Sequence, residues 1–343
     1  MGLLLEVNMK KGLLIIPVII LAITMNVSAG GTSEKKDTFK EEGVTYRHFA
    51  TIGTGSVTGV YYSAGESISK MVNKKIDIYG QKVTVESTDG SVFNINAVMD
   101  GDLEFGIVQS DRQTQAWAGT DKWKEAGPQK DLRAICALYP ESVTLIAAVD
   151  ANINSIEDLK GKVVSIGNPG SSNRGNAIIA LENAGLNWET DIKAESLKAS
   201  ETAKMLQDGH IDAFFYTVGH PNDSFKEATA GKRKVKFIPI TNIDRLLEKY
   251  PYYTKSVIPV EFYPNAAYTE DVETFGVKAI LITSASVHDD IVYAVTKEIF
   301  DNLDEFKALH PAFDVLTKEN MMRGLTVPFH PVALKYFTEA GLK

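Results

Sequence analysis

Two stretches of the chain repeat one plan: a strand-like run, a loop of small residues, a helix and a second strand. The first run, residues 48–52, leads into Gly53-Thr54-Gly55-Ser56. The second run, residues 163–167, leads into Gly170-Ser171-Ser172. Strands that alternate with helices predict an α/β fold with parallel pairing. We therefore expect two similar α/β lobes, with a chance likeness of generic strand–turn–helix units as the alternative.

The two copies can be aligned residue by residue. Asp100-Gly101 aligns with Asp208-Gly209, and Ile52-Gly53 aligns with Ile166-Gly167. Ligands of open α/β sheets bind at the carboxyl ends of the strands. The repeat therefore predicts a cleft to which each lobe contributes one Gly/Ser loop and one strand end.

Composition narrows the class of protein. At 343 residues the chain exceeds what one hydrophobic core usually supports, which favours two lobes. Its formal charge is −8 and it has no dense Lys/Arg block, so we expect no nucleic-acid partner. The single cysteine, Cys136, excludes an internal disulfide and a cysteine-rich metal site.

The first residues have the pattern of a secretory signal. Lys10-Lys11 precedes an apolar run over 13–25, and small residues follow up to a cleavage point after Ala29. The run is short for a membrane span, which needs roughly 20 residues, although a retained anchor helix is the alternative. We predict a signal peptide over 1–29, a flexible leader over 30–44, and a soluble protein in a bacterial periplasm.

Apolar spacing and breakers predict the elements that follow. Strands are expected over 48–52, 82–86, 103–108, 163–167, 211–216, 235–238 and 276–283. Helices are expected over 61–72, 91–99, 174–184, 200–207, 243–249, 289–302 and 331–340, with Ser200 as a cap. Residues 241–264 read as an ordered loop region around the helix at 243–249, and the tail is expected to pack on the first lobe.

The sequence does not match most motifs of enzymes and cofactor-binding proteins. Gly53, Gly55 and Gly59 are spaced one residue too far apart for a dinucleotide fingerprint. The loop at Gly170 has Arg174 where a nucleophile elbow needs glycine. The six histidines never pair at helical spacing, so zinc-ligand spacing is absent. We predict no catalytic residues, no cofactor and no metal.

The two loops have the chemistry of an anion site. Glycine allows backbone to approach a ligand, and N–H groups at a helix start favour an anion. Gly55 and Ser56 are the candidates in the first loop. Arg174 could clamp a carboxylate in the second, or be a surface arginine on a capped helix. The candidates in the second loop are Ser171, Ser172, Asn173 and Arg174.

Further candidates follow predicted strands or open predicted helices. Gly90 and Ser91 open a helix behind Asp89, which could cap it. Gln109 and Tyr216 occupy equivalent strand ends in the two copies. Of Tyr61 and Tyr62, we expect one in the core and one in the cleft, and we assign Tyr62 to the ligand.

Several of these segments together resemble the TAXI family of TRAP-transporter substrate-binding proteins. The matching pieces run from residue 46 to the C-terminus and include 53–62, 87–91, 106–111, 132–140, 156–162, 164–174 and 208–216. The resemblance implies a two-lobed type II periplasmic-binding-protein fold with crossing hinge strands. We expect lobe 1 over 45–140 and 262–343, and lobe 2 over 141–261.

The resemblance also implies a function. We expect a monomeric, non-catalytic receptor for a small carboxylate or amino-acid ligand, such as glutamate or 2-oxoglutarate, that delivers it to a TRAP membrane permease. Replacing Arg174 with Ala is then expected to weaken binding by about 2–5 kcal/mol. The alternatives are a receptor of an ABC importer, an exported α/β enzyme and a surface interaction protein.

Overall fold

The computed structural model describes residues 39–41, 44–46, 48–267 and 270–343. The predicted signal peptide, 1–29, lies outside these residues, as does most of the predicted leader. At the end of that leader β1 (Phe39–Glu41) pairs antiparallel with β2 (Val44–Tyr46), and the flexibility of the leader stays a prediction. Val44, Thr45 and Tyr46 are strand-favouring residue types. No helix in the described part of the chain is long and apolar enough to span a bilayer.

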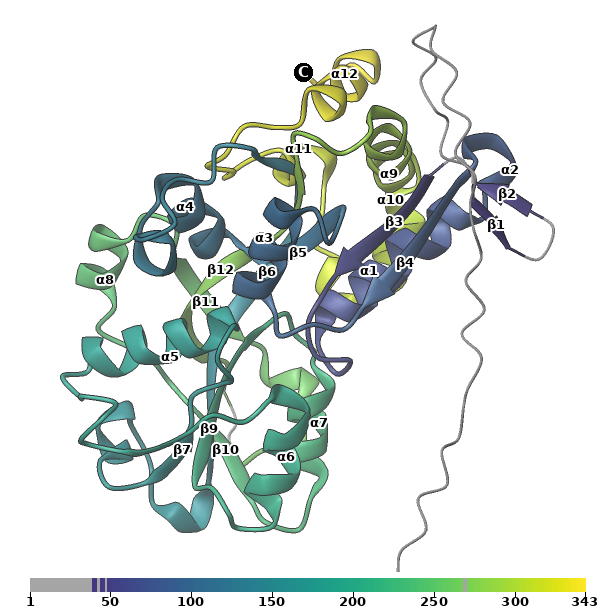
Figure 1. The fold of residues 1–343 in the computed structure, drawn as a ribbon. Coiled ribbons are helices and arrows are strands. Elements are labelled where there is room, and N and C mark those ends of the chain that lie inside the picture. The colour runs from purple at the N-terminus through teal and green to yellow at the C-terminus, as the bar shows by residue number, and fades with distance from the viewer. Residues whose placement is uncertain (1–38, 42–43, 47, 268–269) are drawn as a thin grey trace, which may run out of the picture. The chain divides into compact units, whose positions relative to one another are not determined.

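A mixed sheet of ten strands organises the rest of the described chain, in the order β4-β3-β5-β12-β6-β9-β7-β8, with β10 on β6 and β11 on β12 (Figure 1). Strands within each end of this sheet pair in parallel. The first strand group is β3 (His48–Gly53), β4 (Gln81–Glu86) and β5 (Phe105–Gln109). The second is β7 (Val163–Ser165), β8 (Lys193–Glu195) and β9 (Ala213–Val218).

Two long strands connect these groups through the middle of the sheet. β6 (Leu132–Ala148) and β12 (Val272–Ser284) are antiparallel to each other; β12 also pairs with β5, and β6 pairs with β9. Gly276 lies where the two strands change neighbours, and a Cβ there would be 2.3 Å from the Glu141 carbonyl oxygen. Glycine therefore allows the close approach of the two strands.

The remaining strands lie on the long pair. β10 (Val235–Ile238) is antiparallel to the end of β6, and β11 (Thr254–Ile258) is antiparallel to the start of β12. β11 falls in the region that we expected to be a loop around a short helix. Its residues are mostly exposed, so it lacks the apolar alternation that predicts a strand.

Helices cover both strand groups (Figure 1). The first group and the tail carry α1 (Val60–Asn73), α2 (Ile76–Tyr79), α3 (Ser91–Asp100), α4 (Ser110–Ala118), α9 (Asp289–Asp301), α10 (Leu303–Lys307), α11 (Lys318–Met321) and α12 (Pro331–Glu339). The second group carries α5 (Ser172–Asn183), α6 (Ala199–Gln207), α7 (Asp223–Ala230) and α8 (Asp244–Lys249). Every residue of β5 is buried, as expected for a strand with both faces covered.

The sheet register supports the repeat and corrects one part of its alignment. Ile52 pairs with Phe105 in the first group, and Val164 pairs with Ala213 in the second. If Phe105 matches Ala213, then Ile52 matches Val164, two residues before the Ile166 that the sequence alignment chose. The error arose because both strands end in a similar apolar–glycine pair, which does not fix the register.

The corrected register explains a hydrogen bond that both copies share. Glu104 Oε2 accepts a hydrogen bond from Thr51 N at 2.7 Å, and Asp212 Oδ2 accepts one from Val163 N at 2.9 Å. In each copy the acid lies just before β5 or β9. It accepts a hydrogen bond from the residue that precedes Ile52 or Val164, the residue that pairs with that strand. The two copies therefore share specific contacts as well as element order.

The α/β fold class with crossing strands is confirmed. The lobe boundaries stay a prediction.

α6 begins at Ala199, so Ser200 lies inside its first turn and is not its cap. β8 was not predicted, because three residues are too few to show periodicity.

Candidate functional site

A cavity of about 320 Å³ lies between the two strand groups. Its walls include the last residues of β5 and β9 and the segments that follow β3, β4, β7 and β8, so it lies at the carboxyl ends of parallel strands from both groups. This is where ligands of open α/β sheets bind. The volume is at the small end of the range for ligand pockets, about 300–1,000 Å³. The cavity therefore fits a small metabolite.

The helix starts are the main polar feature of this cavity. The first residues of α1, α3, α5 and α6 all line it: Val60, Ser91, Ser172 and Ala199. Their backbone N–H groups have no hydrogen-bond acceptor within the described part of the chain. N-terminal N–H groups and the helix dipole favour negative charge. The helix starts of both strand groups therefore suit the cavity for an anion.

Two of these helices begin directly after a glycine, and at each position the structure shows why glycine is needed. Gly59 precedes α1, and a Cβ there would be 2.6 Å from the Tyr216 hydroxyl oxygen. Gly90 precedes α3 with φ of 103°, a conformation that side chains disfavour. Neither cap has a side chain that could accept from the helical N–H groups. At α3 the N–H groups of Val92 and Phe93 donate to the Gly170 carbonyl, which leaves the N–H group of Ser91 for a ligand.

Direct hydrogen bonds join the two sides of the cavity. Ser91 Oγ is 3.0 Å from Ser172 Oγ, and Val92 N donates to the Gly170 carbonyl at 3.2 Å. Asn222 Nδ2 donates to the Thr58 carbonyl at 2.8 Å. At the rim, Lys198 is 3.0 Å from Asp89, but both are exposed and such pairs contribute little. The arrangement is therefore one in which the two sides are closed on each other.

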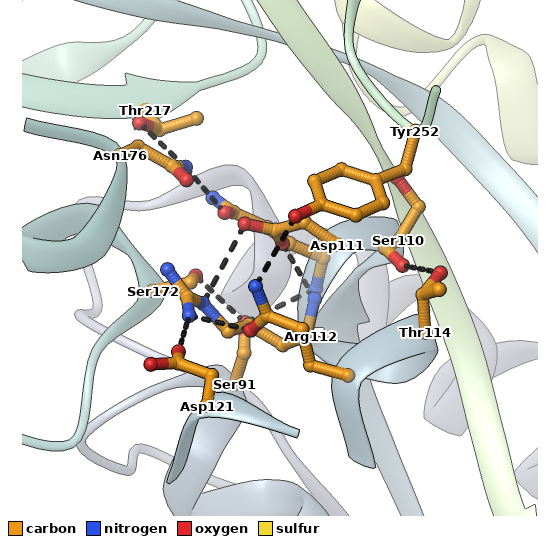
Figure 2. Close-up of polar contacts among 12 residues, drawn as sticks. Ser91, Ser110, Asp111, Arg112, Thr114, Asp121, Ser172, Asn176, Thr217 and Tyr252 are labelled. Carbon is orange, nitrogen blue, oxygen red and sulfur yellow. Dashed lines mark hydrogen bonds and ion pairs between the residues drawn. The ribbon is translucent and has the colours of Figure 1, made fainter. Parts of the chain in front are cut away.

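A buried polar network lies behind the cavity (Figure 2). Asn176 of α5 donates to Gln109 Oε1 at 2.6 Å and to Thr217 Oγ1 at 3.2 Å, so it ties together the equivalent ends of β5 and β9. The Tyr253 hydroxyl oxygen lies 2.9 Å from Asn176 Oδ1 and 3.2 Å from Asp111 Oδ2, so its one hydrogen can be donated to either. This network fixes the strand ends on which the cavity is built.

Arg112 extends the network at the start of α4. It donates to Asp121 Oδ2 at 2.5 Å and to Gln115 Oε1 at 2.6 Å (Figure 2). Burial alone would lower the pKa of the guanidinium, but neighbouring Asp111 raises it, so Arg112 stays charged. Gly175 makes room for it, because a Cβ there would be 1.7 Å from Arg112 Nη2. This arginine does not line the cavity and serves contacts between α4 and α5.

Glu141 is a candidate ligand residue that the sequence motifs did not reveal. It lies in β6 where the strand changes neighbours, lines the cavity and is 1% exposed. Tyr61 donates to its Oε2 at 2.9 Å. Burial raises the pKa of the Glu141 carboxyl well above its usual range. A signal was present in the sequence, since Glu141 is the one acid in the apolar run 132–148.

Most of the predicted ligand residues meet at this cavity. Those that line it are Gly55, Ser56, Gly90, Ser91, Gln109, Ser171, Ser172, Asn173 and Tyr216. Their contact with a ligand stays a prediction. Asn173 has a structural part as well, because it donates to the Phe215 carbonyl at 3.1 Å and accepts from Thr217 N at 3.0 Å.

Arg174 and Tyr62 are not brought to the cavity. Arg174 donates to Ser196 Oγ at 2.8 Å, and its guanidinium carbon is 4.8 Å from the centre of the Trp188 ring. Arg174 is not among the residues that line the cavity, so this arrangement gives no support to the predicted carboxylate clamp. On α1 it is Tyr61, and not Tyr62, that lines the cavity. Successive helical residues differ by about 100° in direction, so Tyr61 can face the cavity while Tyr62 faces elsewhere.

A possible metal-binding group lies elsewhere. His48, His288 and Asp290 place ligand atoms within 4.8 Å of one another. They come from the start of β3 and the start of α9, so their spacing along the chain could not reveal the group. They do not line the cavity, so this group is separate from the candidate ligand site.

Comparison with known families places this fold and cavity in context. A model described as the NMT1-like family matches residues 52–341. The chain belongs to the NMT1-like family. The match includes every segment that lines the cavity of this NMT1-like protein.

Several solved structures are similar to this NMT1-like protein. A protein of Bordetella bronchiseptica RB50 is 16% identical with a TM-score of 0.50, over 86% of this chain and 82% of that one. The binding-protein component of an ABC phosphonate transporter from Pseudomonas aeruginosa is 11% identical with a TM-score of 0.49, over 77% and 78%. The periplasmic aliphatic sulphonate binding protein SsuA of Escherichia coli is 16% identical with a TM-score of 0.44, over 84% and 82%. At such identities the likeness concerns the fold alone.

Proposed function

We propose that this chain is a periplasmic solute receptor that binds a small organic anion between its two halves. The observation that carries the proposal is the convergence of four helix starts, with free N–H groups, on one cavity of about 320 Å³. Backbone donors at helix starts bind carboxylates without a cationic side chain. A net charge of −8 is therefore no obstacle to binding an anion.

Binding couples to closure in this proposal. Contacts such as Ser91–Ser172 exist only when the two sides meet. A ligand held by helices of both sides has more contacts in the closed form, and this differential affinity shifts the population towards it. The crossing strands β6 and β12 supply the hinge.

The role is non-catalytic. No His or Cys is among the residues that line the cavity, so it offers no imidazole base and no thiol nucleophile. Conversion of any bound compound to product would contradict this part of the proposal and favour an exported enzyme.

The partner that we propose is the membrane permease of a TRAP transporter. The segments that resemble the TAXI family supply much of the cavity wall, including Gly55-Ser56, Gly90-Ser91 and Ser171-Ser172. An ABC importer is the second candidate, because its receptors are built on the same crossing-strand plan. Transport with the cognate permease in vesicles separates the two: an ion gradient alone drives uptake in the first case, and ATP is needed in the second.

The binding proposal is tested by calorimetric titration. The protein is unfolded and refolded to strip any ligand, then titrated with amino acids, mono- and dicarboxylates, 2-oxo acids, sulphonates and phosphonates. We expect one site per chain for a carboxylate. A saturating ligand at 100 times its Kd should also stabilise the fold by about 2.7 kcal/mol. Refolded protein that binds no member of this panel would contradict the proposal.

A further inference from the structure

Glu141 is buried in the cavity wall without a cationic partner. Its Oε2 accepts from Tyr61 at 2.9 Å, while its Oε1 has no hydrogen-bond partner within the described residues. No ion pair joins Glu141 to Lys, Arg or His in that part of the chain. Lys198, the basic residue of the cavity wall, is 62% exposed and pairs with Asp89. The carboxyl group is therefore desolvated and unpaired.

The groups around Glu141 are phenols, a serine and another acid. Tyr61 of α1 is joined by Tyr139 in β6 and Tyr216 in β9, and the charge of Asp111 acts from α4. Desolvation and Asp111 raise the pKa of the Glu141 carboxyl, and only the hydrogen bond from Tyr61 opposes them. A buried ionised carboxylate without a partner is costly, so the group needs either a proton or a cation from the ligand.

The acid lies one side chain away from an anion-binding helix start. Tyr61 Oη is 2.9 Å from Glu141 and 3.5 Å from the hydroxyl of Ser91, the first residue of α3. A ligand whose carboxylate meets that helix start can therefore place a neighbouring cationic group at Glu141. An α-amino acid has these two charges on adjacent carbon atoms.

We propose that Glu141 is the counter-ion for the ammonium group of the ligand, so that the receptor selects α-amino acids over the corresponding 2-oxo acids. This inference rests on the proposed function and names its substrate class. The helix starts bind the carboxylate, and Glu141 binds the ammonium group. A 2-oxo acid offers only lone pairs to Glu141 and needs that carboxyl group protonated.

Proton linkage gives the proposal a thermodynamic signature. An ammonium group at Glu141 favours the ionised carboxylate, so binding releases a proton whenever the free protein holds Glu141 protonated. Affinity for an amino acid then rises with pH up to the raised pKa and levels off above it. Affinity for a 2-oxo acid, which favours the protonated form, is constant below the raised pKa of Glu141 and falls above it.

The test uses ligand pairs that differ only at C2. L-glutamate, 2-oxoglutarate and glutarate share five carbons and two carboxylates, but C2 has an ammonium, an oxo group or two hydrogens. L-alanine with pyruvate, and L-leucine with 4-methyl-2-oxopentanoate, extend the set to monocarboxylates. Each is titrated calorimetrically at pH 6 and pH 8, at each pH in two cationic amine buffers that hold that pH and differ in ionisation enthalpy, so that proton release is counted directly.

The wild-type protein should bind one amino acid at least about tenfold more tightly than its oxo partner, and should release a proton on binding. Glu141→Gln keeps the size of the side chain and its acceptor for Tyr61 but removes the charge. The substitution should weaken affinity for the amino acid by roughly 30-fold or more and abolish proton release. Glu298→Gln is the matched control, because Glu298 is also 1% exposed but does not line the cavity, and it should change neither quantity.

Two results would overturn the inference in distinguishable ways. Tighter binding of an oxo acid or glutarate, with little effect of Glu141→Gln, removes the role of Glu141 and leaves the anion receptor intact. Refolded wild-type protein that binds no member of the set or of the wider panel removes the proposed function and this inference with it.

Discussion

His220 is half-buried between two hydroxyl groups. Its Nε2 is 2.9 Å from Thr144 Oγ1 and its Nδ1 is 2.6 Å from Tyr263 Oη. Burial lowers the pKa of this imidazole to about 3, against about 6.5 in the unfolded chain. Between these two values the unfolded state binds the proton more tightly, so the contribution of His220 to stability is lost as pH falls below 6.5.

From pH 7 to pH 5 this linkage should cost about 2 kcal/mol in the free energy of unfolding. Glu141 acts in the opposite direction, since its raised pKa favours the folded state as pH falls. The effect of His220 is therefore measured by difference, from urea unfolding of wild type and His220→Gln at both pH values. The variant should lose about 2 kcal/mol less on acidification, and an equal loss in both proteins would contradict the assignment.

Arg174 lies in the second Gly/Ser loop but is committed to other contacts. Because it packs over Trp188 and donates to Ser196, Arg174→Ala should leave ligand affinity within about twofold. It should lower stability by about 1 kcal/mol, through the lost stacking and hydrogen bond. Titration and urea unfolding of the variant check both numbers. A tenfold loss of affinity would restore the clamp that the sequence suggested.

The start of α6 offers a way to remove one proposed donor at the level of the element. Proline is tolerated at the first position of a helix and lacks an N–H group. Lys198, which precedes Ala199, has φ −71° and ψ 149°, a conformation that a following proline accepts. Ala199→Pro should therefore preserve α6 and weaken anion binding about 10- to 100-fold, the equivalent of one charge-assisted hydrogen bond.

The matched control is Asp223→Pro at the first position of α7. Asn222 before it is also extended, and residue 223 does not line the cavity. Calorimetric titration should give the wild-type Kd for this variant. Equal effects of the two prolines would show that the α6 N–H group is not a ligand donor.

Much of the element pattern could be predicted because the signals are local. The helix predicted over 61–72 is α1, and the strand predicted over 235–238 is β10, since amphipathic spacing and turn residues bound both. β6 could not be recognised as one strand, because Pro140 and Glu141 interrupt its apolar run. What joins its two parts is pairing with β12 and β9, which are distant in the sequence.

The site shows the same division between local and distant information. Loops such as Gly55-Ser56 and Ser171-Ser172 could be predicted because a glycine or serine run before a helix indicates an anion-binding loop from neighbouring residues alone. The roles of Tyr61 and Glu141 depend on a contact between residues 80 positions apart. A loop motif also does not predict in which direction the side chains of the following helix point, as Arg174 and Tyr62 illustrate.

At the scale of the whole molecule, the proposed receptor function depends on duplication. Two copies of one strand–loop–helix unit face each other, and within each copy an equivalent acid, Glu104 or Asp212, joins the two strands. This arrangement brings helix starts from both copies to one cavity, so neither copy alone completes the anion site. Ligand and closure are therefore expected to stabilise each other.

Amide spectroscopy tests this claim most directly. In two-dimensional spectra of ¹⁵N-labelled protein, a bound carboxylate should move the amide resonances at the four helix starts, Val60, Ser91, Ser172 and Ala199, more than others. Hydrogen bonding to an anion should shift them downfield. Saturable binding that leaves these four resonances in place, and moves those of another surface such as 185–189, would contradict an anion site built from the two copies.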